Sequence, residues 1–333
     1  MAGRMRAVVI DAPGEADVLQ LREVPLPRPD ASEVRIAVRA FGLNRSELHF
    51  RSGQAYTGSF PRIPGIEAVG VVDEAPGGQF EPGTQVMTMS GGMGRVFDGG
   101  YAEYVVVPVE QVIAFRSGLP WGVLGAVPVM LQTAYGSLTV GVGFTPQAAG
   151  SLLVRGGTSS VGLAAIGLAA RWGANVIATT RSASKAQLLR DAGASHVVID
   201  DGAVADAVRR LVPDGVDGAI ELVGVETLRD TLRAVRVGGT AVFTGMLADV
   251  WTVRDFYPMD FIPNGVRLTS YAGETSDLLA DVLQGYLDAV EAGSMSVPVG
   301  ATYRIDDIVQ AHRDLEQNRH PGKKVVVLGA PQR

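Results

Sequence analysis

The sequence predicts an α/β protein in which a doubly wound parallel sheet is inserted into a β-rich domain. Residues 126–267 alternate apolar strands with helical stretches, which is typical of a parallel sheet covered by helices on both faces. Residues 1–125 contain short strands separated by proline and glycine, and residues 268–333 add further helices and a strand. Because 333 residues are enough for two domains, we predict one domain at 1–125 plus 268–333 and another at 126–267.

The β-rich domain is predicted from short apolar runs that end in turn-forming residues. Turn clusters such as PLPRP at 25–29 and APGG at 75–78 separate these runs. Its strands are predicted at 7–10, 33–40, 68–74, 85–89, 102–107 and 324–328, and its helices at 277–292 and 306–318.

The inserted domain begins with an apolar run, a turn of small residues and a helical pattern that continues to Trp172. The residues after it repeat the alternation of strand and helix. Its later strands are predicted at 176–180, 196–199, 218–222 and 240–244, and its later helices at 186–192, 204–211 and 227–235.

The turn between the first strand and the first helix predicts a dinucleotide site. A helix that follows a glycine-rich turn directs unpaired N–H groups and its positive dipole end at a pyrophosphate. Gly157 would permit the tight turn, and Gly162 would let the helix pack closely on the sheet. Ser159 stands where the fingerprint has its middle glycine, so the motif alone is weak and its strand–turn–helix context strengthens it. The predicted pyrophosphate contacts are Gly157, Thr158, Ser159, Ser160, Val161 and Gly162.

The end of the second strand favours NADPH over NADH. An NAD site has an acidic residue about 20 residues beyond the glycines, where it accepts from the ribose 2′-hydroxyl. Here that position is Thr180, with Arg181, Ser182 and Lys185 beside it. These donors suit a 2′-phosphate. The alternative is a basic start of a solvated helix.

Composition is that of an intracellular enzyme. The net charge of -6 gives no reason to expect nucleic acid or an anionic membrane as a partner. There are no cysteines, so neither disulfides nor cysteine-ligated metal can form. The N-terminal residues lack the apolar core of a signal peptide, and the apolar run at 161–170 is too short to cross a bilayer. We therefore expect a cytoplasmic protein.

Seven short motifs, found in the same order along nearly the whole chain, resemble those of the medium-chain dehydrogenase/reductases. The resemblance is to their zinc-free quinone oxidoreductase branch, the zeta-crystallin-like proteins, and it implies a GroES-like catalytic domain, a Rossmann domain, NADPH and a homodimer. The motifs are MRAV (5–8), GLNRSELH (42–49), RSG (51–53), PGIEAVG (64–70), GGYAEY (99–104), GGTSSVG (156–162) and PGKKVV (321–326).

The positions that bind zinc in alcohol dehydrogenases of this superfamily are changed here. By the resemblance, Asn44 replaces a cysteine ligand and Ile66 replaces the histidine of a Gly-His-Glu stretch. No cysteine is available as a third ligand, and the four histidines show no metal-ligand spacing. We therefore expect no metal.

Without a metal, the acceptor should be a quinone or an enone. Hydride addition to a simple ketone leaves an alkoxide, whose conjugate acid is nearly as weak as water, with a pKa of about 15.7. Reduction of a quinone or of an enone β-carbon leaves a delocalised phenolate or enolate, and a phenol has a pKa of about 10. Hydrogen-bond donors and water are then sufficient.

Candidate catalytic residues follow the strand at 33–40. Asn44 and Tyr56 could donate hydrogen bonds to the developing oxyanion, and His49 lies on the same segment. The resemblance places an asparagine and a tyrosine near the nicotinamide, although Tyr56 falls one residue later than expected. The alternatives are a turn asparagine, a surface tyrosine and a structural histidine.

The resemblance adds contacts near the nicotinamide. Thr133 would lie beside the ribose, and Gly245 and Met246 near the carboxamide, at the carboxyl end of a strand. Thr133 could instead be a helix-interior threonine bonded to its own backbone. The aperiodic, aromatic segment 248–265 could wall the substrate pocket or form a dimer contact.

The leading hypothesis is an NADPH-dependent quinone or enone reductase, with its site in the cleft between the two domains. One alternative is a reductase of enoyl thioesters or of a specialised metabolite on the same fold. An outside alternative is an NADPH-binding structural or RNA-binding protein, against which the acidic balance counts.

Overall fold

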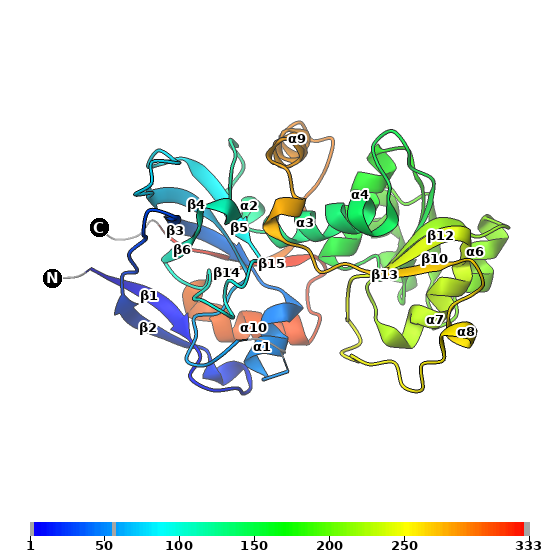
Figure 1. Ribbon diagram of the computed structural model, residues 1–333, viewed down its shortest axis with the longest axis horizontal. Coiled ribbons are helices and arrows are strands. Elements are labelled where there is room, and N and C mark those ends of the chain that lie inside the picture. The colour runs from blue at the N-terminus through cyan, green and yellow to red at the C-terminus, as the bar shows by residue number, and fades with distance from the viewer. Residues whose placement is uncertain (1–2, 55–57, 330–333) are drawn as a thin grey trace. The chain divides into compact units, whose positions relative to one another are not determined.

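The computed structural model describes residues 3–54 and 58–329, which form two compact units (Figure 1). Unit 1 consists of the chain up to Val129 together with the chain from Glu274 on, and unit 2 is Met130–Gly273. The chain therefore leaves unit 1, builds unit 2 and returns. The predicted boundaries at 125/126 and 267/268 lie a few residues earlier. The second falls short because β13 (Arg267–Ser270) pairs with a strand of unit 2.

Unit 2 is a six-stranded sheet in which every neighbouring pair is parallel. The strand order is β10-β9-β8-β11-β12-β13, which is the doubly wound order 3-2-1-4-5-6 of a Rossmann sheet. The strands are β8 (Ser151–Arg155), β9 (Asn175–Thr180), β10 (His196–Ile199), β11 (Val216–Glu221), β12 (Val235–Phe243) and β13.

Helices cover both faces of this sheet because its strands are apolar on both sides. Leu152, Leu153 and Val154 are all fully buried, as expected of a central parallel strand. Helices α4 and α7 lie on opposite faces (Figure 1). The helices are α3 (Pro128–Gly136), which begins in unit 1, α4 (Ser160–Arg171), α5 (Ala186–Asp191), α6 (Ala205–Leu211), α7 (Val225–Ala234) and α8 (Pro258–Phe261).

Unit 1 is built on a seven-stranded, mostly antiparallel sheet. Its strand order is β14-β15-β3-β4-β5-β7, with β6 also paired to β3. A separate hairpin-like pair joins β1 and β2. The strands are β1 (Arg4–Val9), β2 (Gln20–Pro25), β3 (Glu33–Gly42), β4 (Glu67–Glu74), β5 (Gln85–Met89), β6 (Tyr104–Pro108), β7 (Val112–Ala114), β14 (Val299–Arg304) and β15 (Lys323–Val327).

In the described part of unit 1, α-helices flank the sheet, and one of them closes its core. The buried residues Ile308 and Ala311 of α10 pack with apolar residues of β1, β3 and β6. A buried apolar face at this helical spacing is what holds a surface helix on a sheet. The helices are α1 (Arg45–Arg51), α2 (Trp121–Leu124), α9 (Ala280–Glu291) and α10 (Ile308–Glu316).

Most predicted elements are present, and the predicted fold class is confirmed. The strands predicted at 85–89 and 196–199 have the predicted bounds. Strands β2, β7 and β13 were not predicted. β2 has the sequence QLREVP, in which no residue is fully buried, so it lacks the apolar alternation of a core strand, and β7 has only three residues.

One helical stretch of the described chain, Trp121–Val142, is long and apolar enough to cross a membrane by length and composition. This stretch is longer than the apolar run at 161–170, which the sequence analysis considered as a membrane-spanning candidate. Of its most apolar window, 72% is buried inside the protein, which is the behaviour of a core helix.

Candidate functional site

The turn from β8 into α4 has the geometry of an anion-binding helix start. Gly156 has a φ of 83°, a conformation that favours glycine, so the tight turn depends on Gly156 rather than on the predicted Gly157. Ser159 is the N-cap of α4, and its hydroxyl accepts a 3.0 Å hydrogen bond from the amide of Gly162. A serine in place of the middle glycine therefore gains a capping role.

Gly162 allows the helix to approach the turn closely. A Cβ atom here would lie 2.7 Å from the carbonyl oxygen of Gly156 and 2.8 Å from Cα of Gly157. No larger side chain fits without moving the backbone. This agrees with the prediction that Gly162 allows close packing of the helix.

The end of β9 presents hydroxyl and basic groups without a carboxylate on the same strand end. Thr180 is buried, and its hydroxyl accepts a 3.2 Å hydrogen bond from the amide of Ser182. Arg181 is exposed and Lys185 is half-buried. The side chains that a 2′-phosphate would need are therefore available at this end of the strand.

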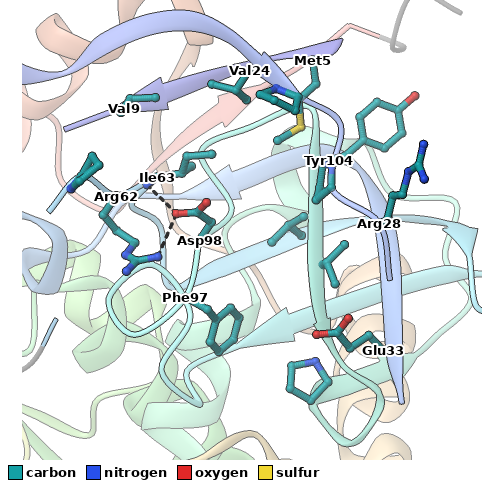
Figure 2. Close-up of a pocket in the computed structure, with 17 residues that line it drawn as sticks. Met5, Val9, Val24, Arg28, Glu33, Arg62, Ile63, Phe97, Asp98 and Tyr104 are labelled. Carbon is teal, nitrogen blue, oxygen red and sulfur yellow. Dashed lines mark hydrogen bonds and ion pairs between the residues drawn. The ribbon is translucent and has the colours of Figure 1, made fainter. Parts of the chain in front are cut away.

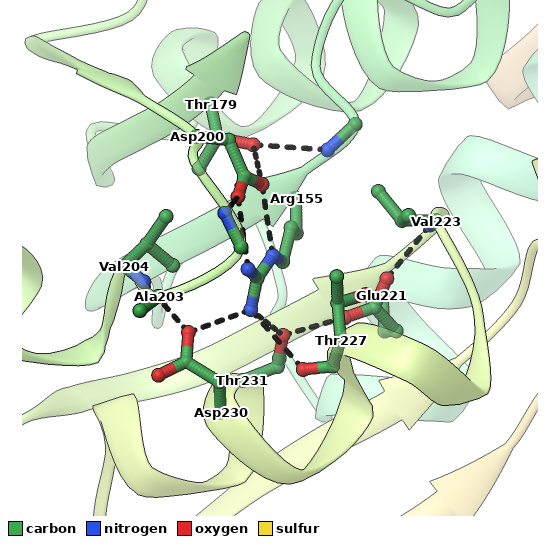
Figure 3. A network of polar contacts seen from close by, with 12 residues as sticks. Arg155, Thr179, Asp200, Ala203, Val204, Glu221, Val223, Thr227, Asp230 and Thr231 are labelled. Carbon is green, nitrogen blue, oxygen red and sulfur yellow. Dashed lines mark hydrogen bonds and ion pairs between the residues drawn. The ribbon is translucent and has the colours of Figure 1, made fainter. Parts of the chain in front are cut away.

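The acidic residue next to this strand end is already engaged. Asp200 follows β10, and its amide donates to the carbonyl of Thr180 at 2.8 Å. Its two carboxylate oxygens accept hydrogen bonds of 2.9 Å each from Nε and Nη2 of Arg155 (Figure 3). Asp200 is thus held by an internal cation.

Arg155 is the centre of a buried network at the carboxyl edge of the sheet (Figure 3). Its Nη1 donates to Asp230 at 2.8 Å and to Thr231 at 3.1 Å. Thr179 donates to Asp200 and accepts from the amide of Gly156, so the network reaches the phosphate turn. We define the Arg155 cluster as Arg155, Thr179, Asp200, Glu221, Asp230 and Thr231.

The pKa values of Asp200 and Glu221 in this cluster are shifted in opposite directions. Burial would raise the pKa of Asp200, but the hydrogen bonds and charge of Arg155 outweigh burial and hold that pKa below its ordinary value. Burial raises the pKa of Glu221, which accepts hydrogen bonds from Thr231 and from the amides of Val223 and Gly224. The Arg155 contacts prevail over burial at Asp200, whereas burial prevails over the hydrogen bonds at Glu221.

The remaining predicted cofactor contacts also lie in unit 2. Gly245 follows β12 at the same edge, and a Cβ there would lie 2.7 Å from the carbonyl oxygen of Leu222, while Met246 is half-buried. Thr133 lies on α3, and its carbonyl accepts from Ser137, whose hydroxyl lies 3.0 Å from that of Thr244. Because the strands are parallel, their carboxyl ends bring the phosphate turn, the 180–185 segment and residues 245–246 to one edge.

In unit 1, Asn44 caps helix α1 together with Glu47. The amide N–H of Asn44 donates to Glu47 Oε2 at 2.9 Å, and the other carboxylate oxygen accepts from the amide of Ile66 at 3.1 Å. Glu47 is buried, and burial raises its pKa. The start of α1 is therefore tied to the strand entry at Ile66.

The side chain of Asn44 takes part in a buried ionic cluster. Its Nδ2 donates to Glu67 at 2.8 Å and, over a longer 3.3 Å contact, to Glu47. The ammonium of Lys323 donates to Asn44 Oδ1 and lies 2.6 Å from Glu67 Oε1. The other Glu67 oxygen accepts from the amide of Val129 in the first turn of α3 at 2.8 Å. We call Asn44, Glu47, Glu67 and Lys323 the Lys323 cluster.

The three predicted catalytic residues have different outcomes. The side-chain amide of Asn44 already donates to Glu67 and to Glu47. Asn44 can therefore donate to a substrate only if it releases one of these carboxylates, and the 3.3 Å contact with Glu47 is the weaker of the two. His49 is buried on the last turn of α1. Tyr56 lies outside the described residues. Their catalytic roles stay predictions.

The residues at the expected metal position do not fit zinc. Within residues 3–54 and 58–329, no group of three or more His, Cys, Asp or Glu side chains could hold a metal ion. Asn44 and Ile66 stand at the ligand positions, and the ammonium of Lys323 already binds Asn44 and Glu67. A catalytic zinc needs three protein ligands, which this donor set does not supply.

A cavity of about 540 Å³ lies elsewhere in unit 1, beside β1, β2 and β6 (Figure 2). Its wall is largely apolar and includes Met5, Val24 and Phe97. Arg62, also in the wall, donates to Asp98 at 3.1 Å. None of the predicted site residues that the structure describes lines this cavity, so it is separate from the predicted reaction centre.

Sequence reasoning missed Arg155 and Lys323. Arg155 interrupts the apolar run SLLVR, and a charge inside a buried strand is a detectable signal that it has a fixed partner. Lys323 belongs to the PGKKVV motif, where nothing in the sequence tells which lysine is paired. The partners of both residues come from distant segments and are visible only in the fold.

Two family matches agree with the two-part architecture. Residues 30–117 match the alcohol dehydrogenase GroES-like domain, and residues 160–292 match the zinc-binding dehydrogenase family. The first match lies in unit 1, and the second covers most of unit 2 and continues into α9. Fold class and family resemblance are thus confirmed.

Curated relatives of similar length are quinone oxidoreductases. The chain is 29% identical to that of Lama guanicoe over 332 residues, which cover 97% of each chain, and 28% identical to that of Homo sapiens, which covers 97% of this chain and 98% of the relative.

Solved structures with the same fold differ in their cofactor. A mycobacterial protein in complex with NADPH has a TM-score of 0.83 and 27% identity over 97% of this chain and 100% of the other. An NAD-dependent alcohol dehydrogenase has a TM-score of 0.85 and is 28% identical, over 98% of this chain and 100% of the other. The cofactor preference must therefore be argued from this chain's own residues.

Proposed function

Because the chain belongs to the medium-chain dehydrogenase/reductase superfamily, as a quinone oxidoreductase-like oxidoreductase, we propose that it is a zinc-independent, NADPH-dependent reductase of quinones or enones. The observation that carries the proposal is the end of β9. Thr180 replaces the ribose-binding acid, and the neighbouring Asp200 is occupied by Arg155. Exposed Arg181 and half-buried Lys185 supply positive charge for a 2′-phosphate.

The cofactor site uses this chain's own groups at three places. The N-terminus of α4, capped by Ser159, would hold the pyrophosphate through its free amides. Arg181, Ser182 and Lys185 would bind the 2′-phosphate. The backbone at residues 245–246 and Thr133 would orient the nicotinamide. Bound NADPH supplies the hydride.

The acceptor class follows from the charge that the product must carry. A quinone or enone distributes the new negative charge over several atoms, whereas a simple ketone concentrates it on one oxygen. The Lys323 cluster holds Asn44, whose amide could donate to the acceptor once its weaker contact with Glu47 is released, and one such donor suits a delocalised product. Asn44, Tyr56 and His49 are the proposed groups for polarising the acceptor carbonyl.

The test is steady-state turnover with a panel of acceptors. Purified protein with NADPH is offered quinones, enones, enoyl thioesters and simple ketones, and the affinities for NADPH and NADH are titrated separately. We expect turnover with quinones or enones, little with ketones, and at least tenfold tighter binding of NADPH. Equal or tighter NADH binding would refute the cofactor assignment, and turnover confined to enoyl thioesters would favour the alternative reductase. A homodimeric state and a cytoplasmic location stay predictions.

A further inference from the structure

Lys323 and Glu67 form a buried ion pair whose partners come from opposite ends of the chain. Their side chains are 2% and 0% exposed, and Nζ lies 2.6 Å from Oε1. Burying two charges is costly unless they are paired and their remaining donors and acceptors are matched. The second oxygen of Glu67 is matched by the amide of Val129, and Asn44 accepts from the ammonium.

The surrounding backbone leaves room for this pair. Gly42, at the end of β3, has no side chain, and a Cβ there would lie against Cε of Lys323, 2.5 Å from Oε1 of Glu67 and 2.9 Å from the carbonyl oxygen of Gly125. An alanine at position 42 would therefore displace the ammonium or the carboxylate. The space beside Gly42 is therefore just large enough for the Lys323–Glu67 pair.

Lys323 also determines how the Asn44 carboxamide is oriented. Because the ammonium can only donate, Oδ1 of Asn44 must face it, and the NH₂ group must then face Glu67 and Glu47. Asn44 and Ile66 are the positions that resemble the first two zinc ligands. A fixed cation thus binds the side chain that occupies the first of these two positions.

We propose that Lys323 is the internal cation of this site and a positioning residue for the reduction, holding Asn44 and Glu67 in the arrangement that the acceptor meets. The positioning part rests on the proposed function. Lys323 does not touch the acceptor, since it is buried, and it acts through Asn44. Substitution of Lys323 therefore changes turnover more than cofactor affinity, because the predicted cofactor contacts lie in unit 2.

The test compares Lys323→Met with Lys324→Met. Lys324 is the adjacent buried lysine, and its ammonium donates to the carbonyl of His320 at 2.9 Å, away from Asn44 and Glu67. We expect Lys323→Met to lower kcat at least tenfold with the Kd for NADPH within twofold of wild type, and Lys324→Met to keep kcat within twofold. Wild-type kcat in Lys323→Met, or an equal loss in both variants, would overturn the positioning role.

A stability measurement tests the ionic part without any substrate. In E67Q/K323M both charges are removed, so no unpaired charge stays buried, and we expect this double variant to melt at a higher temperature than Lys323→Met. If Lys323→Met fails to fold, a folded double variant supports the proposal. A double variant that is no more stable than the single one overturns it.

Failure of the proposed function gives a different result. If the wild-type protein binds NADPH but reduces none of the acceptors, the quinone or enone assignment is wrong. The melting temperatures of the single and double variants then decide by themselves whether Lys323 is the internal cation.

Discussion

Arg155 in unit 2 and Lys323 in unit 1 are both buried beside carboxylates, but their surroundings differ. Each guanidinium nitrogen of Arg155 donates to a carboxylate, hydroxyl or carbonyl oxygen. In unit 1, by contrast, Nε and Nη1 of Arg51 and Nδ1 of His312 are buried without a hydrogen-bond partner among the described residues. Among the described residues, the buried side-chain nitrogen and oxygen atoms without a hydrogen-bond partner all lie in unit 1 and not in unit 2.

The difference shows two uses of buried charge. The planar fork of arginine joins the end of β8 to Asp200 after β10 and to Asp230 and Thr231 of α7 at once (Figure 3). The ammonium of Lys323 is a point charge that orients one carboxamide. Loss of Arg155 should mainly lower the stability of the protein, whereas loss of Lys323 should mainly lower its turnover.

The largest expected effect is the loss of Arg155. Arg155→Met leaves Asp200 and Asp230 without their cation, and removal of one partner from a buried pair costs about 3–5 kcal/mol. Urea unfolding measures this loss in the free energy of unfolding. The matched control is Arg229→Met, which breaks the exposed 2.8 Å pair with Asp260 and should cost less than about 1 kcal/mol. Equal losses would contradict a special role for the Arg155 cluster.

Replacement of the proposed donors in unit 1 should lower turnover. Asn44→Ala and Tyr56→Phe each remove one donor from the developing oxyanion, which can cost about 2.7–4 kcal/mol when the charge is localised. We expect less here, because a phenolate or enolate spreads its charge, and we expect Tyr56→Phe to affect enones more than quinones. The measurement is kcat with both acceptor types, together with the Kd for NADPH, which should stay nearly unchanged. Wild-type kcat in both variants would exclude this segment from the mechanism.

The exposed cation at the end of β9 should control the choice of cofactor. Arg181→Ala removes one charge-assisted phosphate contact, worth about 1.5–3 kcal/mol, or at least a tenfold loss of NADPH affinity. NADH affinity should not change, because NADH lacks the 2′-phosphate. Arg190→Ala, an exposed arginine on α5, is the control and should leave both affinities unaltered. Parallel losses for both cofactors would contradict the assignment.

Acid should destabilise unit 1 through His312. Burial, with a smaller contribution from the charge of Arg51, lowers the pKa of His312 to about 3, and the ring nitrogen Nε2 lies 3.1 Å from the hydroxyl of Tyr101. Below pH 6.5 the unfolded chain binds a proton that the folded chain does not, so stability falls as the pH is lowered towards 3.

A comparison with His312→Phe isolates this proton. Between pH 7 and pH 5 the free energy of unfolding of wild type should fall by about 2 kcal/mol more than that of the variant. Urea titrations at the two pH values measure the difference. The same decrease in both proteins would show that other groups cause the acid sensitivity.

The smallest expected effect is that of a chelator. Asn44 and Ile66 stand where two zinc ligands are expected and no cysteine is available as a third, so EDTA should change neither turnover nor melting temperature. Elemental analysis of the purified protein accompanies the assay. Stoichiometric zinc that is lost together with activity would refute zinc independence and the role of Lys323.

Local chemistry along the chain was sufficient to predict the fold class and the strand–turn–helix from β8 into α4. Strand, turn and helix are specified by neighbouring residues, so the alternation at 126–267 and the glycines around Ser159 could be interpreted without tertiary contacts. Even there, the fold decided a detail: the positive φ belongs to Gly156 and not to Gly157. Backbone angles at adjacent glycines depend on how the turn packs.

Only the tertiary structure decided which charges are paired. The hydrogen bond between Lys323 and Asn44 joins residues 279 positions apart, and that between Arg155 and Asp200 joins residues 45 apart. Sequence patterns report periodic burial within one element, whereas the partner of a buried charge is set by which elements the sheets bring side by side. The type of protein is therefore determined locally along this chain, and the arrangement of its charged groups by long-range packing.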